Sequence, residues 1–253
     1  MAGREIGSSP VPRLAFISHH HEDVAVANSL VTPLANFGFS SFLAHRDLQA
    51  GGDWIDEIKQ KLRESAVLIA IITSSFLRSD WTDQEVGFAI GRDVPVVPVM
   101  RGSTPYGFLS SIQGVNWKDY DHGGRRPDGG WTYEERAEQE ATLGRALLNR
   151  GAVDLRQFAQ CLEHSTSWSA TQCLVRTIGD FSSLAPADFE ALAEACATNQ
   201  EIYNSPGIHQ LRAALTERAT SLSASLVSRL IHRNLIINGS QIDGVPEMKL
   251  ASE

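Results

Sequence analysis

The sequence predicts an α/β fold, in which a parallel sheet of five strands is covered by helices on both faces and is followed by a mainly helical C-terminal region. Three observations support this. Short apolar runs alternate with segments of helical spacing, the connections between them are short, and after residue 131 the helical spacing continues without a convincing strand until residues 235–238. Strands and helices in alternation give parallel strands with right-handed crossovers.

The first strand is predicted at residues 13–18, an apolar run that ends in small polar residues. From Asp23 to Phe37 the apolar side chains recur at helical spacing, with Asp23 as the expected cap and Gly38 as the stop. A second strand is expected at residues 39–43. The helix that begins after Asp53 is expected to bury Trp54, Ile55, Ile58 and Leu62.

Residues 66–72 form the most hydrophobic segment and predict a central strand that is buried on both faces. A helix over residues 82–90 then leads into residues 94–100. Pro95 and Pro98 indicate that this fourth strand has limited pairing and lies near an edge of the sheet. A weak fifth strand is expected at residues 113–117.

The second half of the chain is predicted to be helical. One helix is expected over residues 134–150, and Pro186 with Asp188 marks the start of another. A leucine-rich stripe from Leu211 to Leu230 indicates one or two more helices. We therefore expect two domains, with the sheet in residues 10–150 and a helical sensor or oligomerisation module in residues 151–253.

The amino-acid composition argues against several classes of function. A formal net charge of -8 argues against binding to the phosphate backbone of nucleic acids, which usually needs a basic surface. The 3 cysteines lack the paired spacing of a zinc or redox site, so they are expected to be ordinary thiols. The first thirteen residues hold no apolar stretch that could act as a signal peptide, and the longest apolar run is too short to span a bilayer. A soluble cytoplasmic protein is expected, with no membrane partner.

Four segments of the first half carry patterns that occur together in one family. Leu14–Ser18 is a strand followed by an acidic helix start, and Phe42–Gly52 is a strand followed by an Arg-Asp-Leu-x-x-Gly loop. The third segment runs from the strand and serine-rich turn of Val67–Phe76 to Trp81–Glu85, a Trp-x-x-x-Glu signature at a helix start. The fourth is Val94–Val99, the next strand. In this order and at this spacing, they resemble a TIR (Toll/interleukin-1 receptor) domain of the bacterial NAD-cleaving type.

The resemblance implies a flavodoxin-like sheet and one of two functions. Some members of the family are adaptors that signal by self-association, whereas others cleave NAD with a glutamate at the position of Glu85. Cleavage of the N-glycosidic bond gives the ribose carbon oxocarbenium character, which a nearby carboxylate stabilises. Nicotinamide leaves as a neutral molecule, so no acid is needed to protonate it. One carboxylate is therefore sufficient, and NAD is the substrate, with no cofactor and no metal expected.

The family layout also implies substrate-binding roles near the carboxyl ends of the strands. Phe16 and Ser18 are expected to line the nicotinamide site, and Arg46 and Asp47 to contact phosphate or ribose. The remaining positions are Ser74, which is expected to bind ribose, and Trp81, whose indole is expected to pack beside the Glu85 carboxylate or to serve as a core anchor.

The same residues also have simpler explanations that involve no catalysis or ligand binding. Glu85 could be a solvent-facing helix residue, and Arg46 with Asp47 could form a loop salt bridge or a self-association surface. The run His19–His21 is expected to be a solvated loop, because consecutive residues point in different directions and no cysteine or regular carboxylate pattern completes a metal site. Gly51 and Gly52 fit neither a P-loop nor a dinucleotide-binding fingerprint.

The leading hypothesis is a NAD glycohydrolase that releases nicotinamide and either ADP-ribose or a cyclic variant of it. Self-association would activate it, an upstream sensor or a downstream messenger-binding effector would be its partner, and antiphage defence or signalling would be its setting. The alternative is a non-enzymatic adaptor in which residues 46–52 make homotypic contacts. A third possibility is a fold related to nucleoside deoxyribosyltransferases, which would need a second substrate base.

Overall fold

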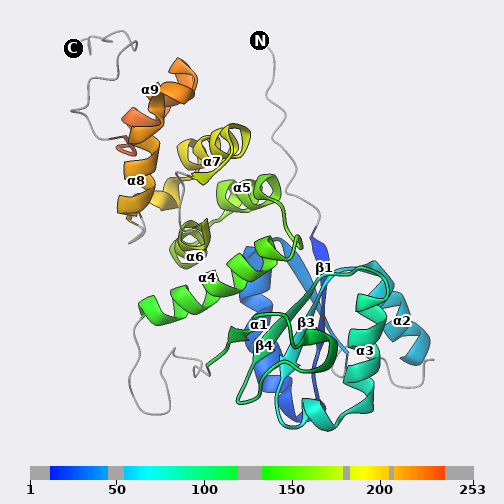
Figure 1. The fold of residues 1–253 in the computed structure, drawn as a ribbon. Coiled ribbons are helices and arrows are strands. Elements are labelled where there is room, and N and C mark those ends of the chain that lie inside the picture. The colour runs from blue at the N-terminus through cyan, green and yellow to red at the C-terminus, as the bar shows by residue number, and fades with distance from the viewer. Residues whose placement is uncertain (1–11, 45–53, 119–132, 179–182, 205–207, 237–253) are drawn as a thin grey trace, which may run out of the picture. The chain divides into compact units, whose positions relative to one another are not determined.

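The computed structural model describes residues 12–44, 54–118, 133–178, 183–204 and 208–236. By their internal contacts, the residues divide into two compact units, Met1–Cys161 and Leu162–Glu253. The first contains the sheet and the second is helical (Figure 1). None of the helices in the described part of the chain is long and apolar enough to cross a membrane.

The sheet has five parallel strands, as the sequence predicted, and the structure places them in the order β2-β1-β3-β4-β5. The strands are β1 (Arg13–Ser18), β2 (Phe39–Leu43), β3 (Ser65–Ile72), β4 (Val96–Met100) and β5 (Val115–Asn116). The predicted central strand is confirmed, since β3 lies between β1 and β4. Its residues from Val67 to Ile72 are completely buried, because neighbouring strands and helices cover both of its faces.

Helices cover the two faces of the sheet. Helices α2 (Trp54–Glu64) and α3 (Asp80–Ile90) lie on one face, and α1 (Val24–Asn36) lies on the other (Figure 1). One core cluster joins Phe16, Leu68 and Ala70 of the sheet to Ile58 of α2 and to Val86 of α3. Helix α4 (Tyr133–Asn149) follows β5 and contacts it. The burial of these apolar side chains is the main force that holds the helices on the sheet.

The fourth strand differs from the prediction in two ways. It begins at Val96 because Asp93, with a φ of 57°, turns the chain at the end of α3. It is also not an edge strand, since it lies between β3 and β5. The prolines are accommodated without losing the pairing: the carbonyl of Pro95 accepts a bond from the amide of Leu68 at 2.9 Å, and Pro98 is in register with Ala70.

The C-terminal unit contains only helices among its described residues, as predicted. These are α6 (Trp168–Ile178), α7 (Pro186–Thr198), α8 (Ile208–Glu217) and α9 (Ala224–His232), with short 3-10 turns at Gln200–Asn204 and Ala219–Ser221. Helix α5 (Leu155–His164) spans the division between the two units. The strand expected from residue 235 does not form at Leu235, whose amide bonds to the carbonyl of Leu230 and closes α9. Residues 237–238 lie outside the described residues.

Candidate functional site

Glu85 is buried at the carboxyl end of the first strand. It lies on α3, its side chain is 4% exposed, and its Oε2 accepts a hydrogen bond of 2.5 Å from the hydroxyl of Ser18. Ser18 is the last residue of β1 and is fully buried. At this strand end, a carboxyl group and a hydroxyl group from distant parts of the chain are therefore hydrogen-bonded to each other.

The start of α3 fixes where Glu85 points. The hydroxyl of Ser79 caps the helix by accepting a bond from the amide of Thr82. The Thr82 hydroxyl is buried and donates to the carbonyls of Phe76 and Ser79 at 3.0 and 2.8 Å. Glu85 and Ala89 follow Thr82 at helical spacing, so all three lie on the inner face of the helix, toward the sheet.

Burial changes the acidity of this carboxyl group. It raises the pKa of Glu85 to about 7, while the hydrogen bond from Ser18 acts in the opposite direction. A carboxyl group with a pKa near 7 can be ionised or protonated at physiological pH, which is the range in which acid, base and electrostatic catalysis are effective. Such shifts occur often at functional sites, although structural residues can also show them.

Two aromatic pairs lie near this end of the sheet. The rings of Phe16 and Phe42 are 5.4 Å apart and belong to the core beneath the strand ends, with Phe16 fully buried. The rings of Trp81 and Trp54 are 4.6 Å apart in an edge-on arrangement, and each residue is close to 40% exposed. Phe16 therefore packs as a core residue, and Trp81 presents part of its indole to solvent.

The sequence did not single out Trp54 as a site residue. It was expected on the buried face of α2, together with Ile58 and Leu62, but it is 39% exposed while those two are buried. Trp54 contacts Trp81 where α2 and α3 begin, and both indoles remain partly exposed there. The signal in the sequence was a tryptophan in the first turn of each of these two helices.

The turns after β1 and β3 are joined by two hydrogen bonds. Thr73 donates its hydroxyl proton to the carboxylate of Asp23 at 2.7 Å, and Ser75 donates to that of Glu22 at 2.6 Å. Asp23 occupies the position before α1, but its side chain makes no capping bond, because it binds Thr73 instead. Ser74, the predicted ribose contact, lies between Thr73 and Ser75 in the sequence and is exposed.

We expect the Thr73→Val variant to lower the free energy of unfolding by about 1–3 kcal/mol. The Thr73 hydroxyl both donates to Asp23 and accepts from the buried amide of Phe76 at 3.0 Å, and valine does neither. The midpoint of urea unfolding measures this loss. In the matched control Thr198→Val, an exposed hydroxyl bonded only to its own helix is removed, and equal losses in both variants would contradict the assignment.

The triple histidine is not a uniform solvated loop. His19 is fully buried, and its Nδ1 donates to the carbonyl of Ile17 at 3.0 Å. His20 is partly exposed and His21 is exposed. The prediction of a solvated loop was wrong for His19, because that residue directly follows β1 and its ring is buried together with the end of the strand.

The remaining predicted site residues, Arg46 and Asp47, lie outside the described residues. So do Gly51, Gly52 and the expected helix cap Asp53. The described residues on either side of this segment are Ala44, which follows β2, and Trp54, which begins α2.

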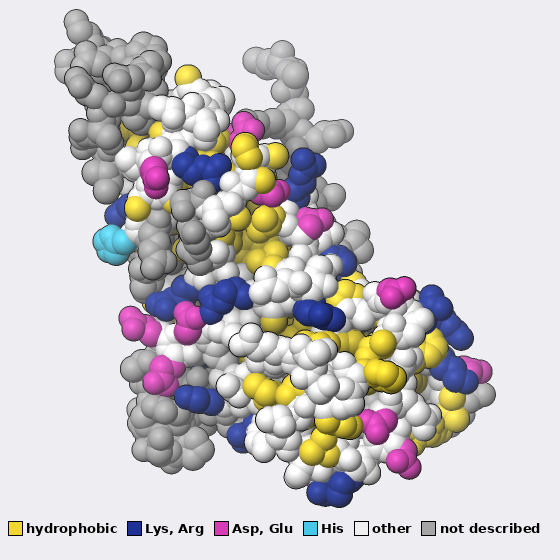
Figure 2. Space-filling view, in the orientation of Figure 1, with side chains coloured by type: hydrophobic (Ala, Val, Ile, Leu, Met, Phe, Trp, Pro, Cys, Tyr) yellow, Lys and Arg dark blue, Asp and Glu magenta, His cyan; other side chains and the backbone are white. Residues whose placement is uncertain are grey.

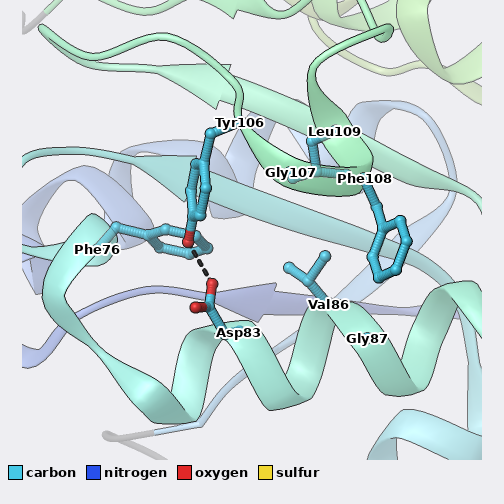
Figure 3. Close-up of a pocket in the computed structure, with 8 residues that line it drawn as sticks. All are labelled: Phe76, Asp83, Val86, Gly87, Tyr106, Gly107, Phe108 and Leu109. Atoms are coloured by element: carbon cyan, nitrogen blue, oxygen red, sulfur yellow. Dashed lines mark hydrogen bonds between the residues drawn. The ribbon is translucent and has the colours of Figure 1, made fainter.

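A pocket that sequence analysis did not anticipate lies on another face of α3. It has a volume of about 240 Å³ and is lined by Phe76, Asp83, Val86, Gly87, Tyr106, Gly107, Phe108 and Leu109 (Figure 3). The hydroxyl of Tyr106 points across it and donates to Asp83, and burial together with that contact raises the pKa of Tyr106. Glu85 does not line this pocket.

Hydrophobic side chains also reach the surface of the sheet-containing unit, where charged side chains are interspersed among them (Figure 2). Phe108, at the rim of the pocket, is 78% exposed, and Leu77 is 41% exposed.

Comparison with known proteins gives three results. Residues 15–129 match the family model described as TIR domain. The human Toll/interleukin-1 receptor domain-containing adapter protein is 27% identical over 121 residues, which cover 46% of this chain and 53% of that protein, so the match spans about half of the relative's length. The crystal structure of the TIR domain of the Toll-related receptor TRR-2 from Hydra magnipapillata aligns with 24% identity and a TM-score of 0.36, covering 41% of this chain and 82% of that chain.

Proposed function

We propose that the sheet-containing unit, whose residues 15–129 match the TIR domain model, cleaves the bond between nicotinamide and ribose in NAD, with Glu85 as its catalytic carboxylate. The observation that carries the proposal is the buried Glu85 side chain, held by Ser18 at the carboxyl end of β1. In open parallel sheets this is the end where ligands bind.

The chemistry requires little more than one anionic group. When the C–N bond breaks, its electron pair goes to the ring nitrogen of nicotinamide, which loses its positive charge. The ribose carbon becomes positively charged, and the ionised Glu85 stabilises it by electrostatic attraction in a poorly solvated site. Water then adds to that carbon and releases one proton, giving ADP-ribose. If a group of the same molecule attacks in place of water, the product is cyclic.

Ser18 would hold the carboxylate in position during this reaction. Its hydroxyl donates to one oxygen of Glu85 and leaves the other oxygen available for the ribose. The exposed indoles of Trp81 and Trp54 supply flat apolar surface at the starts of two helices. Such surfaces pack well against planar bases, and the nicotinamide ring of NAD is planar and cationic, which favours contact with an indole face.

We propose further that self-association of the domain activates the reaction and that the helical unit acts as the sensor or the oligomerisation module. In antiphage defence or signalling, the reaction would deplete NAD or produce a nucleotide messenger. The match to a human adapter protein favours a second candidate, in which the domain only binds other TIR domains. The two candidates differ in whether NAD is consumed.

The test is incubation of the purified full chain with NAD, both free in solution and clustered on beads, with nicotinamide measured by chromatography. The enzymatic proposal expects release of nicotinamide that increases on clustering. If no nicotinamide appears under either condition while light scattering shows that the chain associates, the adaptor function is the correct one.

A further inference from the structure

Three potential metal ligands meet in the turn that follows β1. His20, His21 and Glu22 each place one ligand atom within 4.8 Å of the others. The two imidazole rings are 4.1 Å apart, and Nδ1 of His20 lies 3.6 Å from Oε2 of Glu22. Two imidazoles and one carboxylate are a ligand set that zinc commonly binds, with a fourth position left to water or another molecule.

The turn holds these groups in place. Residues His21–Asp23 form a 3-10 turn, and the amide of Asp23 donates to the carbonyl of His20 at 2.8 Å. The carboxylate of Asp23 accepts a hydrogen bond from the hydroxyl of Thr73, which follows β3. The backbone that carries the three ligands is therefore tied both to itself and to the neighbouring turn, which lowers the entropy lost when a cation is bound.

A supporting contact orients the carboxylate. Oε2 of Glu22 accepts a hydrogen bond of 2.6 Å from Ser75, and Arg78 approaches the same serine hydroxyl at 3.4 Å. Hydrogen bonds of this kind to metal ligands contribute to affinity in many metal sites.

We propose that His20, His21 and Glu22 bind a divalent transition-metal cation of the Zn²⁺ type. The ligand atoms of a tetrahedral zinc site are about 3.4 Å apart, so the exposed side chains of His21 and Glu22 must close by roughly an ångström. Both have the freedom to do so, since they are at the surface. Imidazole and carboxylate ligands suit Zn²⁺ better than Mg²⁺ or Ca²⁺, which prefer oxygen atoms alone.

This site is separate from the proposed catalytic group. No metal was expected from the sequence, because consecutive histidines point in different directions and no cysteine or regular carboxylate pattern accompanies them; in the structure, the turn brings Glu22 close to His20 and His21. His19 is excluded from the site, since its ring is buried and its Nδ1 is bonded to Ile17.

The test is a titration of the untagged full chain with ZnCl₂, in competition with a chromogenic zinc indicator, after chelator treatment and removal of the chelator. We expect a site of one equivalent per chain that is lost in the His20→Ala/His21→Ala variant. Its affinity should fall at least about tenfold in Glu22→Gln and in Ser75→Ala, which removes the supporting hydrogen bond. Zn²⁺ should also raise the unfolding temperature of the wild type but not that of the double variant.

His19→Asn is the discriminating control. The asparagine amide can donate to the Ile17 carbonyl as the Nδ1 group does, so the variant is expected to fold and to bind Zn²⁺ within about twofold of the wild type. Other histidines and the cysteines are the same in every variant, so their contribution cancels. Unchanged binding in the double variant, or a loss in His19→Asn as large as in Glu22→Gln, overturns the proposal. Unfolding temperatures without zinc identify any variant that fails to fold.

Discussion

The Glu85→Gln variant is expected to be more stable than the wild type at pH 8 and to have nearly the same stability at pH 4.5. Burial raises the pKa of Glu85 from 4.5 in the unfolded chain to about 7 in the folded protein. Below pH 4.5 both states carry the proton. Between about pH 4.5 and 7 the unfolded chain loses this proton while the folded protein retains it, so stability falls by about 3 kcal/mol over this range and stays level above it, whereas glutamine does not titrate.

Unfolding temperatures measured from pH 4.5 to 8 would show this effect. For a protein of this size, about 3 kcal/mol corresponds to a difference of roughly 5–10 °C between variant and wild type at pH 8. Glu64→Gln provides a control of opposite sign. The exposed Glu64 has a lowered pKa, chiefly because Gln60 donates a hydrogen bond to it, so its removal should destabilise at neutral pH. A constant difference between Glu85→Gln and the wild type at all pH values would show that the carboxyl group does not titrate as described.

Nicotinamide release by the wild type is expected to depend strongly on pH. Only the ionised Glu85 stabilises the cationic ribose, so kcat/KM should fall tenfold for each pH unit below about 7, and by about a hundredfold at pH 5. When NAD is bound, its cationic nicotinamide ring favours the ionised carboxylate. The fall in kcat should therefore occur at lower pH than the fall in kcat/KM.

Initial rates of the clustered protein from pH 5 to 8, at saturating and at low NAD, separate the two profiles. Light scattering at each pH serves as the control for loss of self-association. A rate that stays constant across this range, while the protein remains folded and clustered, is incompatible with an ionised Glu85 as the required group.

The strands were predictable because burial on both faces leaves a direct mark on the sequence. The run at residues 66–72 is apolar at every position, which few solvent-exposed segments are, and it became the central strand β3. The start of β4 was not predictable, because it depends on the left-handed conformation of Asp93 after α3, whereas its end at Met100 was predicted correctly. Strand β5 pairs with β4 over two residues only, so the strand pattern in this part of the sequence was weak.

For the site, the sequence identified residue types and the structure supplied their partners. Glu85 and Ser18 were both named from strand ends and a family motif, but the bond between them joins residues 67 positions apart and depends on how α3 packs against β1. The same holds for Thr73 with Asp23 and for Trp54 with Trp81. The Tyr106–Asp83 pocket was missed because its lining comes from a helix and a later turn without a shared motif.

The most direct test of the account compares nicotinamide release by the clustered wild type and by the Glu85→Gln variant at pH 8. Glutamine preserves the shape of the side chain and can still accept the bond from Ser18, so only the charge is lost. Asp80→Asn removes an exposed carboxylate from the first turn of the same helix and serves as the matched control. The account predicts that release falls at least about a hundredfold in Glu85→Gln and is unchanged in Asp80→Asn. Equal release by Glu85→Gln and the wild type would show that this carboxylate is not the catalytic group.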